Sequence, residues 1–131
     1  MGDKTPNKVE ELTLEAAQQK LDAGALLLDV RNKDEWDAGH APQARYLPLP
    51  RLREDPAAAL GEIRFWLENR SPDATSSEVV VVCRSGQRSL KAAEILISHG
   101  IPASNLAGGM KAWAEAGLEM VAEGSDEPKV I

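Results

Sequence analysis

The sequence predicts an α/β protein with a mainly parallel central sheet flanked by helices on both faces. Short apolar runs alternate along the chain with stretches of helical period, which is the pattern of strand–helix–strand units. One of these runs, residues 79–83, begins with four consecutive valines. Such a run of β-branched residues is typical of a strand covered on both faces in a parallel sheet. The length of 131 residues fits a single domain.

The first helix and the first strand follow from a capping residue, a glycine and an apolar run. Thr13 is a suitable N-cap for a helix over residues 14–23, where apolar residues recur at helical spacing. Gly24 ends this helix, because glycine readily adopts the left-handed conformation just past a helix C-terminus. Residues 25–30 (ALLLDV) form a short apolar run, which predicts a buried strand.

The next part of the chain is predicted to hold two helices separated by a loop. Asn32 and Glu35 have the spacing of a capping box for a short helix that ends at Gly39. Residues 40–50 include three prolines, so we expect a loop with short extended pieces. An Asp-Pro pair opens the stretch 55–69 as N-cap and first helical residue, which predicts the second of these helices.

The second half of the chain repeats the alternation of strand and helix. The polar residues 71–78 are expected to be a loop that leads into the strand at 79–83. Residues 89–99 have the pattern of an amphipathic helix, and a glycine follows directly. Residues 105–107 then predict a short strand, after which two glycines turn the chain into a last helix at 110–116.

Charge and hydropathy exclude several classes of partner. The chain has 15 Lys and Arg residues against 21 Asp and Glu residues, a formal net charge of −6. This balance argues against a general affinity for nucleic acid or for an anionic membrane. The longest apolar run is too short to cross a bilayer, and the N-terminus lacks the apolar stretch of a secretory signal. We therefore expect neither nucleic acid nor a membrane as partner, and a cytoplasmic location.

The sequence holds one cysteine, Cys83, so a disulfide within the chain is impossible. One cysteine and two distant histidines cannot supply a thiolate-rich structural zinc site. We therefore expect no structural metal site. By composition, residues 1–10 are expected to be a flexible lead-in and residues 11–118 the folded body. Residues 119–131, in which four acidic residues outnumber one lysine, are expected to be a solvated acidic tail.

The stretch CRSGQRS at residues 83–89 carries the strongest chemical signal. It lies between the most apolar strand and an amphipathic helix, where sheets of this class bind ligands and where free helix amides favour an anion. Gly86 lets the backbone curl so that several N–H groups point at one spot, and Arg84 and Arg88 add positive charge. These features predict a lowered pKa and a reactive thiolate at Cys83. An inert buried cysteine would need neither the two arginines nor the glycine.

Three further polar residues are expected to support the site. Asp29 and Arg31 end the first predicted strand, and we expect them to hold the sheet to the next loop by hydrogen bonds rather than to take part in chemistry. His40 precedes the proline-rich loop and is expected to line the rim of the cleft or to be structural. Ser85 lacks the G-x-S-x-G context of a nucleophilic serine, which argues against a serine hydrolase.

Three stretches, in order and at suitable separations, resemble the signatures of the rhodanese-like sulfurtransferases in their single-domain form. The resemblance covers residues 12–117. The first signature is seen in Asp29-Val30-Arg31, Glu35-Trp36 and Gly39-His40-Ala41-Pro42, the active-site loop in residues 83–89, and the closing signature in Leu106-Ala107-Gly108-Gly109 with Trp113.

This resemblance implies a rhodanese-like fold and a sulfur transfer that needs no cofactor. Cys83 would take the outer sulfur of a small anionic donor such as thiosulfate, and cyanide or a thiol would then accept that sulfur from the persulfide. By the same resemblance the main chain of the loop holds the persulfide, Arg84 faces the sulfonate oxygens of the donor and Arg88 closes the loop. The implied substrate-binding loop consists of Arg84, Ser85, Gly86, Gln87, Arg88 and Ser89.

Three other functions stay open at this stage. A cysteine-based phosphatase or arsenate reductase of the same architecture has one more residue between cysteine and arginine than the four found here. A regulatory binding module often lacks the cysteine, which this chain keeps. A persulfide relay that passes sulfur to a dedicated protein acceptor differs from a small-molecule sulfurtransferase only in its partner. The sequence does not distinguish the persulfide relay from the small-molecule sulfurtransferase.

Overall fold

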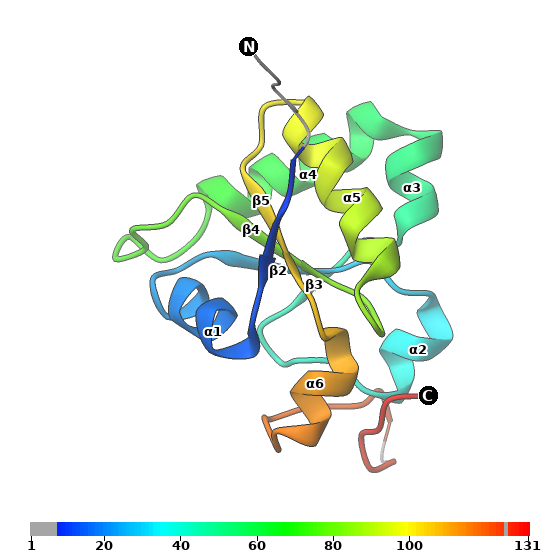
Figure 1. The fold of residues 1–131 in the computed structure, drawn as a ribbon. Coiled ribbons are helices and arrows are strands. Elements are labelled where there is room, and N and C mark those ends of the chain that lie inside the picture. Colours follow the sequence, from blue (N-terminus) through cyan, green and yellow to red (C-terminus); the bar gives the residue numbers. More distant parts are fainter. Residues whose placement is uncertain (1–7, 125) are drawn as a thin grey trace.

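The core of the molecule is a parallel five-stranded sheet with helices on both faces, as predicted (Figure 1). The computed structural model describes residues 8–124 and 126–131. The strands lie in the order β1-β5-β4-β2-β3. In chain order the elements are β1 (Glu10–Leu12), α1 (Leu14–Asp22), β2 (Leu26–Asp29), α2 (Lys33–Ala38), β3 (Arg45–Tyr46), α3 (Leu49–Glu54), α4 (Pro56–Glu68), β4 (Val79–Val82), α5 (Gln87–Ser98), β5 (Ala103–Leu106) and α6 (Gly109–Glu115).

Alternate side chains of the central strands fill two separate cores. Val79 and Val81 of β4 face a core shared with α3, α4 and α5, whereas Val80 and Val82 face a core shared with α1 and α6. Figure 1 shows these two sets of helices on opposite sides of the sheet. All four valines are fully buried, which explains why this strand is apolar without alternation.

The parallel topology brings the chemically interesting segments to one edge of the sheet. Cys83 follows the end of β4, Asp29 is the last residue of β2, and the glycine pair of the closing signature follows β5. Because β4 lies between β2 and β5, these three strand ends are neighbours. The loop that begins with Cys83 therefore lies at the centre of the edge of the sheet where the strands have their carboxyl ends.

One short strand, β1, and one helix were not predicted, and a second short strand, β3, lies where short extended pieces were expected. Strands β1 and β3 have three and two residues, and each pairs only at an outer position of the sheet. Runs this short carry no period, so only their pairing to distant strands defines them. The helix α3 begins at the end of the stretch 40–50 expected to be loop and continues to Glu54. Its prolines are Pro48 at the N-cap and Pro50 within the first turn, where a missing N–H costs nothing.

Several predicted boundaries shift by a few residues. α5 begins at Gln87 rather than at Ser89, so the active-site loop turns directly into the helix. β5 covers Ala103–Leu106 rather than residues 105–107. Of the lead-in expected at 1–10, residues 1–7 lie outside the described residues, and Glu10 already belongs to β1.

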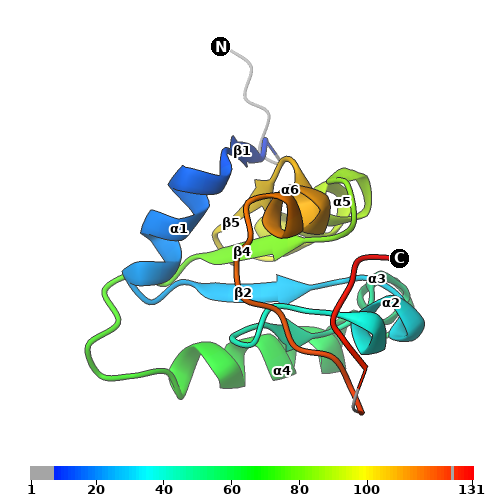
Figure 2. The same ribbon diagram turned by 90° about the horizontal axis from the view of Figure 1, so that it is seen from below.

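The segment that follows α6 packs against the domain instead of forming a solvated tail. Val121 forms an antiparallel bridge with His40, and Met120 and Val130 pack against the core between the sheet and α6. The backbone N–H of Lys129 donates to the carbonyl of Ala38 at 2.9 Å. Figure 2 shows this segment, in orange to red, crossing from α6 to α2. The acidic side chains of the segment are exposed, as their composition indicates, but backbone and apolar contacts hold the chain in place.

Candidate active site

Cys83 lies buried at the bottom of a loop whose amides converge on its sulfur. The N–H of Gly86 lies 3.1 Å from Sγ, and the N–H of Ser89 lies 3.3 Å from it. The Ser89 hydroxyl also donates to Sγ, at 3.2 Å. The sulfur atom is therefore surrounded by hydrogen-bond donors, which is the surrounding that a thiolate or a persulfide anion requires.

The carbonyl groups of the same loop are turned away from the sulfur and held there. The N–H groups of Met110 and Lys111, at the start of α6, donate to the carbonyls of Cys83 and Arg84 at 2.8 and 3.1 Å. The side-chain Nδ2 of Asn105 donates to the carbonyl of Gly86 at 2.9 Å. With these three carbonyl oxygens held by other partners, the loop presents the N–H groups of Gly86 and Ser89 to the sulfur of Cys83.

Two glycines make this close packing possible. Gly86 has a φ of +107°, and a Cβ there would lie 2.5 Å from the carbonyl oxygen of Ala107. Gly109 has a φ of +61°, and a Cβ there would lie 2.4 Å from the carbonyl oxygen of Arg84. A side chain at either position would therefore be strained and would push the loop away from β5 or α6. The role of Gly86 was anticipated from sequence, whereas Gly109 was expected to be part of a turn and of the closing signature, without a contact to the loop.

The pKa of Cys83 reflects a competition between burial and hydrogen bonding. Burial alone would raise the pKa of the thiol, because it disfavours the charged form. Hydrogen bonds from the Ser89 hydroxyl and from the N–H groups of Ser89, Gly86 and Ser85 outweigh burial and lower the pKa below its ordinary value. The direction agrees with the expectation from sequence, but its principal source is the hydrogen bonds rather than the arginines.

Arg88 forms an ion pair with Glu35, which the sequence placed in a capping box and in the first signature but not beside the loop. Its Nη1 and Nη2 atoms donate to the two oxygens of Glu35 at 2.7 and 2.9 Å, which joins the first turn of α5 to α2. The hydrogen bond to Arg88 lowers the pKa of Glu35, so the pair is ionised at neutral pH. The charge of Arg88 is therefore largely balanced by Glu35, and the guanidinium acts chiefly as a brace for the loop.

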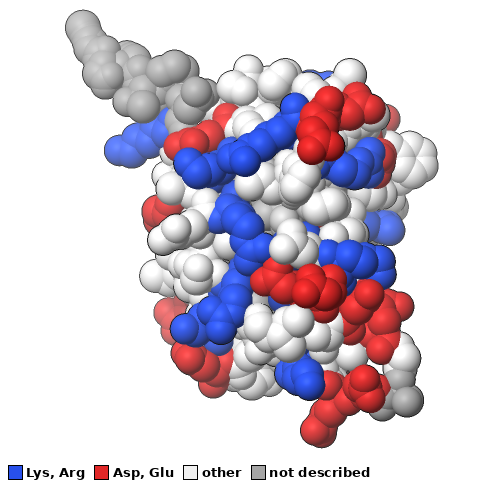
Figure 3. All heavy atoms as spheres, turned by 90° about the vertical axis from the view of Figure 1, so that its right-hand side faces the viewer, with Lys and Arg blue, Asp and Glu red and all other residues white. Residues whose placement is uncertain are grey.

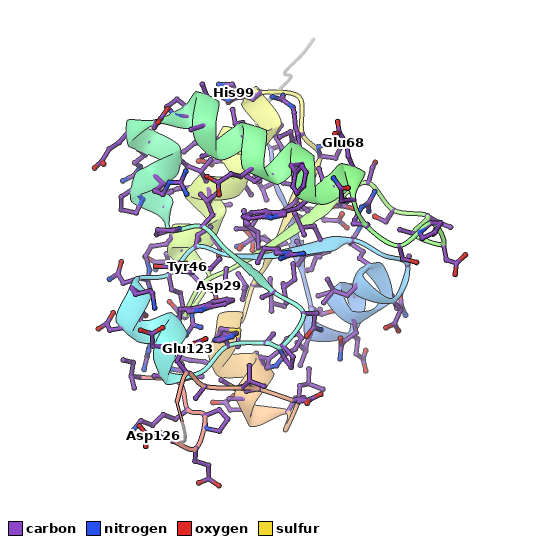
Figure 4. All side chains as sticks on the ribbon, turned by 180° about the vertical axis from the view of Figure 1, so that it is seen from behind. Asp29, Tyr46, Glu68, His99, Glu123 and Asp126 are labelled. Atoms are coloured by element: carbon purple, nitrogen blue, oxygen red, sulfur yellow. The ribbon has the colours of Figure 1, made fainter. Side chains whose placement is uncertain are left out.

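Asp29 and Arg31 form a fully buried ion pair at the end of β2. The Nη2 atom of Arg31 lies 2.8 Å from Oδ2 of Asp29 and 2.7 Å from the carbonyl oxygen of Gly39. The pair thus ties the sheet to the chain that follows α2. Asp29 lies near the middle of the molecule, next to Tyr46 of the paired strand (Figure 4). No atom of either side chain is exposed, so neither can meet a ligand in this arrangement.

His40 is buried behind the site rather than exposed at a rim. Its ring stacks on Trp36 with centroids 3.5 Å apart and an interplanar angle of 6°. Its Nδ1 donates to the carbonyl of Trp36 at 2.7 Å, and its backbone forms the bridge to Val121. The ring and backbone of His40 therefore connect α2 to the C-terminal segment. His99, in contrast, lies at the opposite end of the molecule from Glu123 and Asp126 of that segment (Figure 4).

Arg84, Ser85 and Gln87 are the exposed side chains of the loop. The Nε of Arg84 donates to the carbonyl oxygen of Ile131 at 2.9 Å, so the last described residues reach the mouth of the site. Oxygens of an anionic donor can take the place of this carbonyl, since both are acceptors for the same guanidinium.

Two residues of the site escaped the sequence analysis, Asn105 and Glu11. Asn105 is buried, and besides the Gly86 carbonyl its Nδ2 donates to Oε1 of Glu11 at 2.9 Å. Asn105 stands in a predicted strand, where a buried polar side chain needs hydrogen-bond partners. This need was the signal in the sequence that could have revealed it. Glu11 could not be found in this way, because it belongs to the short strand that the sequence did not indicate.

Neither a membrane helix nor a metal cluster is found among the described residues. No helix in residues 8–124 and 126–131 is long and apolar enough to span a bilayer. In the same residues no group of three or more His, Cys, Asp or Glu side chains is placed to hold a metal ion.

Comparison with known proteins assigns the fold and the loop to one family. Residues 13–116 match the rhodanese-like domain, and the chain belongs to this family. It is 31% identical over 125 residues to thiosulfate sulfurtransferase 18 of Arabidopsis thaliana, covering 92% of this chain and 91% of that protein. It is also 31% identical over 111 residues to the putative sulfur carrier protein YrkF of Bacillus subtilis, covering 82% of this chain but only 52% of that protein.

A solved structure supports the fold. The rhodanese-related protein of Thermoplasma volcanium superposes with a TM-score of 0.67 at 24% identity, over 87% of this chain and 99% of that chain. At this identity the likeness concerns the fold alone. Together with the sulfurtransferase-named relatives, it makes the chain a rhodanese-like domain of the sulfurtransferase family, as the resemblance of its motifs indicated.

Proposed function

We propose that this protein is a sulfurtransferase that moves a sulfane sulfur through a persulfide on Cys83. The donor is a small anion such as thiosulfate, and the acceptor is cyanide or a thiol. The observation that carries the proposal is the set of three donors, two N–H groups and one hydroxyl, within 3.3 Å of a buried Sγ. A hydrolase that works on phosphate would need room for a tetrahedral anion, whereas these donors close around a single atom.

The reaction consists of two displacements at sulfur. In the first, the Cys83 thiolate attacks the outer sulfur of thiosulfate, the S–S bond of the donor breaks, and sulfite leaves with the electron pair. In the second, cyanide or a thiolate attacks the outer sulfur of the persulfide, and the Cys83 thiolate leaves. Neither step needs an oxidant, a metal or an organic cofactor. The amides of the loop stabilise the negative charge that stays on sulfur throughout.

The other loop residues have supporting roles in this proposal. Arg84 is exposed at the mouth and binds the oxygens of the donor. Arg88, braced by Glu35, keeps the loop closed, and Ser89 stabilises the thiolate when the persulfide is discharged. We also propose a cytoplasmic location, because a lone reactive thiolate is maintained in a reducing compartment.

The proposal is tested by thiocyanate formation from thiosulfate and cyanide. We expect activity from the wild type, none above background from Cys83→Ser, and a raised KM for thiosulfate with Arg84→Ala. The matched control is Arg53→Ala, an exposed arginine on α3 that is not part of the loop. Full activity of the serine variant would refute the mechanism. Hydrolysis of p-nitrophenyl phosphate by the wild type, without thiocyanate formation, would favour the phosphatase alternative.

A sulfur-carrier role is the second candidate. It is supported by the likeness to YrkF, whose name describes a putative sulfur carrier, and by the presence of only one cysteine in the sequence. Without a second thiol in the given sequence, the acceptor of the persulfide sulfur must come from outside it, as a carrier that serves a protein partner requires. A carrier is expected to accept sulfur readily and to release it slowly to cyanide, so single-turnover rates of the two steps separate the roles.

A further inference from the structure

We propose that a band of exposed cations beside the active site docks an acidic protein that exchanges sulfur with Cys83. The band consists of Arg84, Lys111, Lys91 and Arg53, and all four side chains are exposed. This inference rests on the proposed function and adds to it the chemistry of the macromolecular partner and the face on which that partner binds.

The four cations are connected along one face of the molecule. Lys111 is hydrogen-bonded through its backbone to Arg84, so both stand at the mouth of the loop. Lys91 lies one turn beyond Gln87 on the exposed face of α5, and it lines a hollow with Arg53 of α3, whose lining also includes one acidic residue, Glu94. Figure 3 shows basic side chains running in a band down this side of the molecule.

These cations form few contacts within the domain. In residues 8–124 and 126–131 none of the four pairs with a side-chain carboxylate, whereas Lys20, Arg31, Lys33, Arg51 and Arg88 each do. Arg84 alone among them donates from its guanidinium to a protein oxygen in these residues, the backbone oxygen of Ile131. Unpaired like charges in one band repel one another, and they do so on a chain whose net charge is −6. Such a band offers a complementary surface to an acidic partner, while the acidic remainder of the molecule repels it and so fixes its orientation.

The extent of the band points to a protein rather than to a small donor. The hollow lined by Lys91 extends along α5 to Ser98, about 10 Å at 1.5 Å per residue, which leads away from the sulfur. A small anion bound at the mouth of the loop would not contact cations that lie along this hollow. The mouth also carries an exposed apolar side chain, because Ile131, whose backbone oxygen accepts from Arg84, is 46% exposed. Charge beside apolar surface is the composition of a protein interface.

The test measures sulfur transfer from preloaded protein to three thiol peptides. The protein is treated with thiosulfate, desalted and shown by mass to carry a persulfide. It then reacts with peptides of equal length in which one cysteine is flanked by Glu and Asp, by Gln and Ser, or by Lys. The quantity of interest is the ratio of the rates for the acidic and the neutral peptide. In the double variant Arg53→Glu/Lys91→Glu we expect this ratio to fall about tenfold at low ionic strength.

The matched control is Lys8→Glu/Arg45→Glu, which changes the net charge equally. Lys8 precedes β1, and Arg45 lines a cavity beside the amino end of β2, so both lie away from the band. Comparing ratios between variants cancels the different intrinsic reactivities of the peptide thiols. Transfer to neutral 2-mercaptoethanol reports the persulfide chemistry itself and is expected to be the same in all variants.

Each outcome bears on the proposal. An equal fall of the ratio in both double variants, or a ratio in the wild type that does not decrease with added salt, would overturn the docking surface while the proposed function stands. Binding of a single-stranded oligonucleotide that the band variant abolishes and the control keeps would reassign the band to nucleic acid. Failure of the wild type to form a persulfide would refute the proposed function, and this inference with it.

Discussion

At the scale of single residues, the reactivity of Cys83 depends on donors that a buried thiol would otherwise lack. Ser89 contributes two of them, its N–H and its hydroxyl, the latter 3.2 Å from Sγ. Burial raises the pKa of Cys83 and the hydrogen bonds lower it. Because Ser89→Ala removes one of these hydrogen bonds, the pKa of Cys83 rises in this variant. We expect the pH midpoint of iodoacetamide alkylation to move upward and the alkylation rate at neutral pH to fall severalfold.

The control for this prediction is Ser85→Ala. Ser85 contributes its backbone N–H to the lowered pKa, and the alanine variant keeps that group. Its alkylation midpoint is therefore expected to match that of the wild type. A Ser89→Ala midpoint equal to the wild-type midpoint would show that the amides alone set the pKa of the thiol.

Asn105 is the residue that holds the loop in its inward-facing conformation. In Asn105→Asp, a carboxylate replaces the Nδ2 donor that lies 2.9 Å from the carbonyl of Gly86, and it also faces Glu11. The carbonyl of Gly86 keeps the N–H of Leu90 but loses the Asn105 donor, and the new buried carboxylate faces two oxygens without a donor between them, which costs about 2 kcal/mol or more of the free energy of unfolding. Urea denaturation measures this loss, and persulfide formation is expected to slow in the folded fraction.

Glu11→Gln is the matched variant for Asn105. It keeps an oxygen that accepts from Asn105 and leaves the bond to Gly86 in place, so a loss of less than about 1 kcal/mol is expected. Equal losses of stability from the two substitutions would mean that the contact of Asn105 with Glu11 stabilises the fold. They would also mean that the hydrogen bond from Asn105 to the carbonyl of Gly86 contributes nothing.

At the scale of elements, the pair of Glu35 and Arg88 joins α2 to the start of α5. The hydrogen bond from Arg88 lowers the pKa of Glu35 in the folded protein. The pair therefore contributes its full stability above the unfolded value of about 4.3, and this contribution is lost as the pH falls through the lower folded value. We expect Glu35→Gln to be less stable than the wild type by about 1–2 kcal/mol at pH 7, a range reduced for the one-third exposure of Arg88.

The pH dependence separates this pair from a general packing effect. The difference in unfolding free energy between the wild type and Glu35→Gln is expected to shrink as the pH falls below about 4. Lys33 and Asp37 form an exposed pair on the same helix and serve as control, so Asp37→Asn is expected to change stability little at any pH. A difference for Glu35→Gln that is constant from neutral pH to pH 3 would contradict the assignment.

The helices and strands that could be predicted from the sequence are those defined by a pattern of neighbouring residues. The four valines of β4 and the capping box of α2 were recognisable because each depends on residues within a few positions. The strand β1 was missed, and β3 was expected only as an unplaced extended piece of residues 40–50, because pairing to distant strands, not their own residues, makes them strands. At the site, the position of Cys83 and the need for Gly86 could be predicted, whereas the partners supplied by Asn105 and Glu35 come from other elements and could not.

At the scale of the whole molecule, the C-terminal segment is part of the folded unit. Composition indicated an acidic tail, yet Met120 and Val130 pack on the core and Trp113 donates to the carbonyl of Glu119 at 2.9 Å. Deleting residues 119–131 uncovers partly buried apolar surface and leaves the indole N–H without its acceptor. We expect the free energy of unfolding to fall by about 2–4 kcal/mol, measured by urea denaturation.

The charge of the segment is expected to matter much less than its apolar contacts. Glu123 and Glu127 are exposed, so replacing both by Gln is expected to change stability by less than about 0.5 kcal/mol. If the deletion were as stable as the wild type, the packing of the segment would contribute nothing. If the Gln variant lost as much as the deletion, charge rather than packing would hold the segment.

The central claim, a persulfide on Cys83, is tested most directly by the intact mass of the protein after treatment with thiosulfate and again after cyanide. The proposal predicts a gain of one sulfur atom that cyanide removes and that Cys83→Ser never acquires. An unchanged mass with thiosulfate, or a gain that the serine variant also shows, would contradict it.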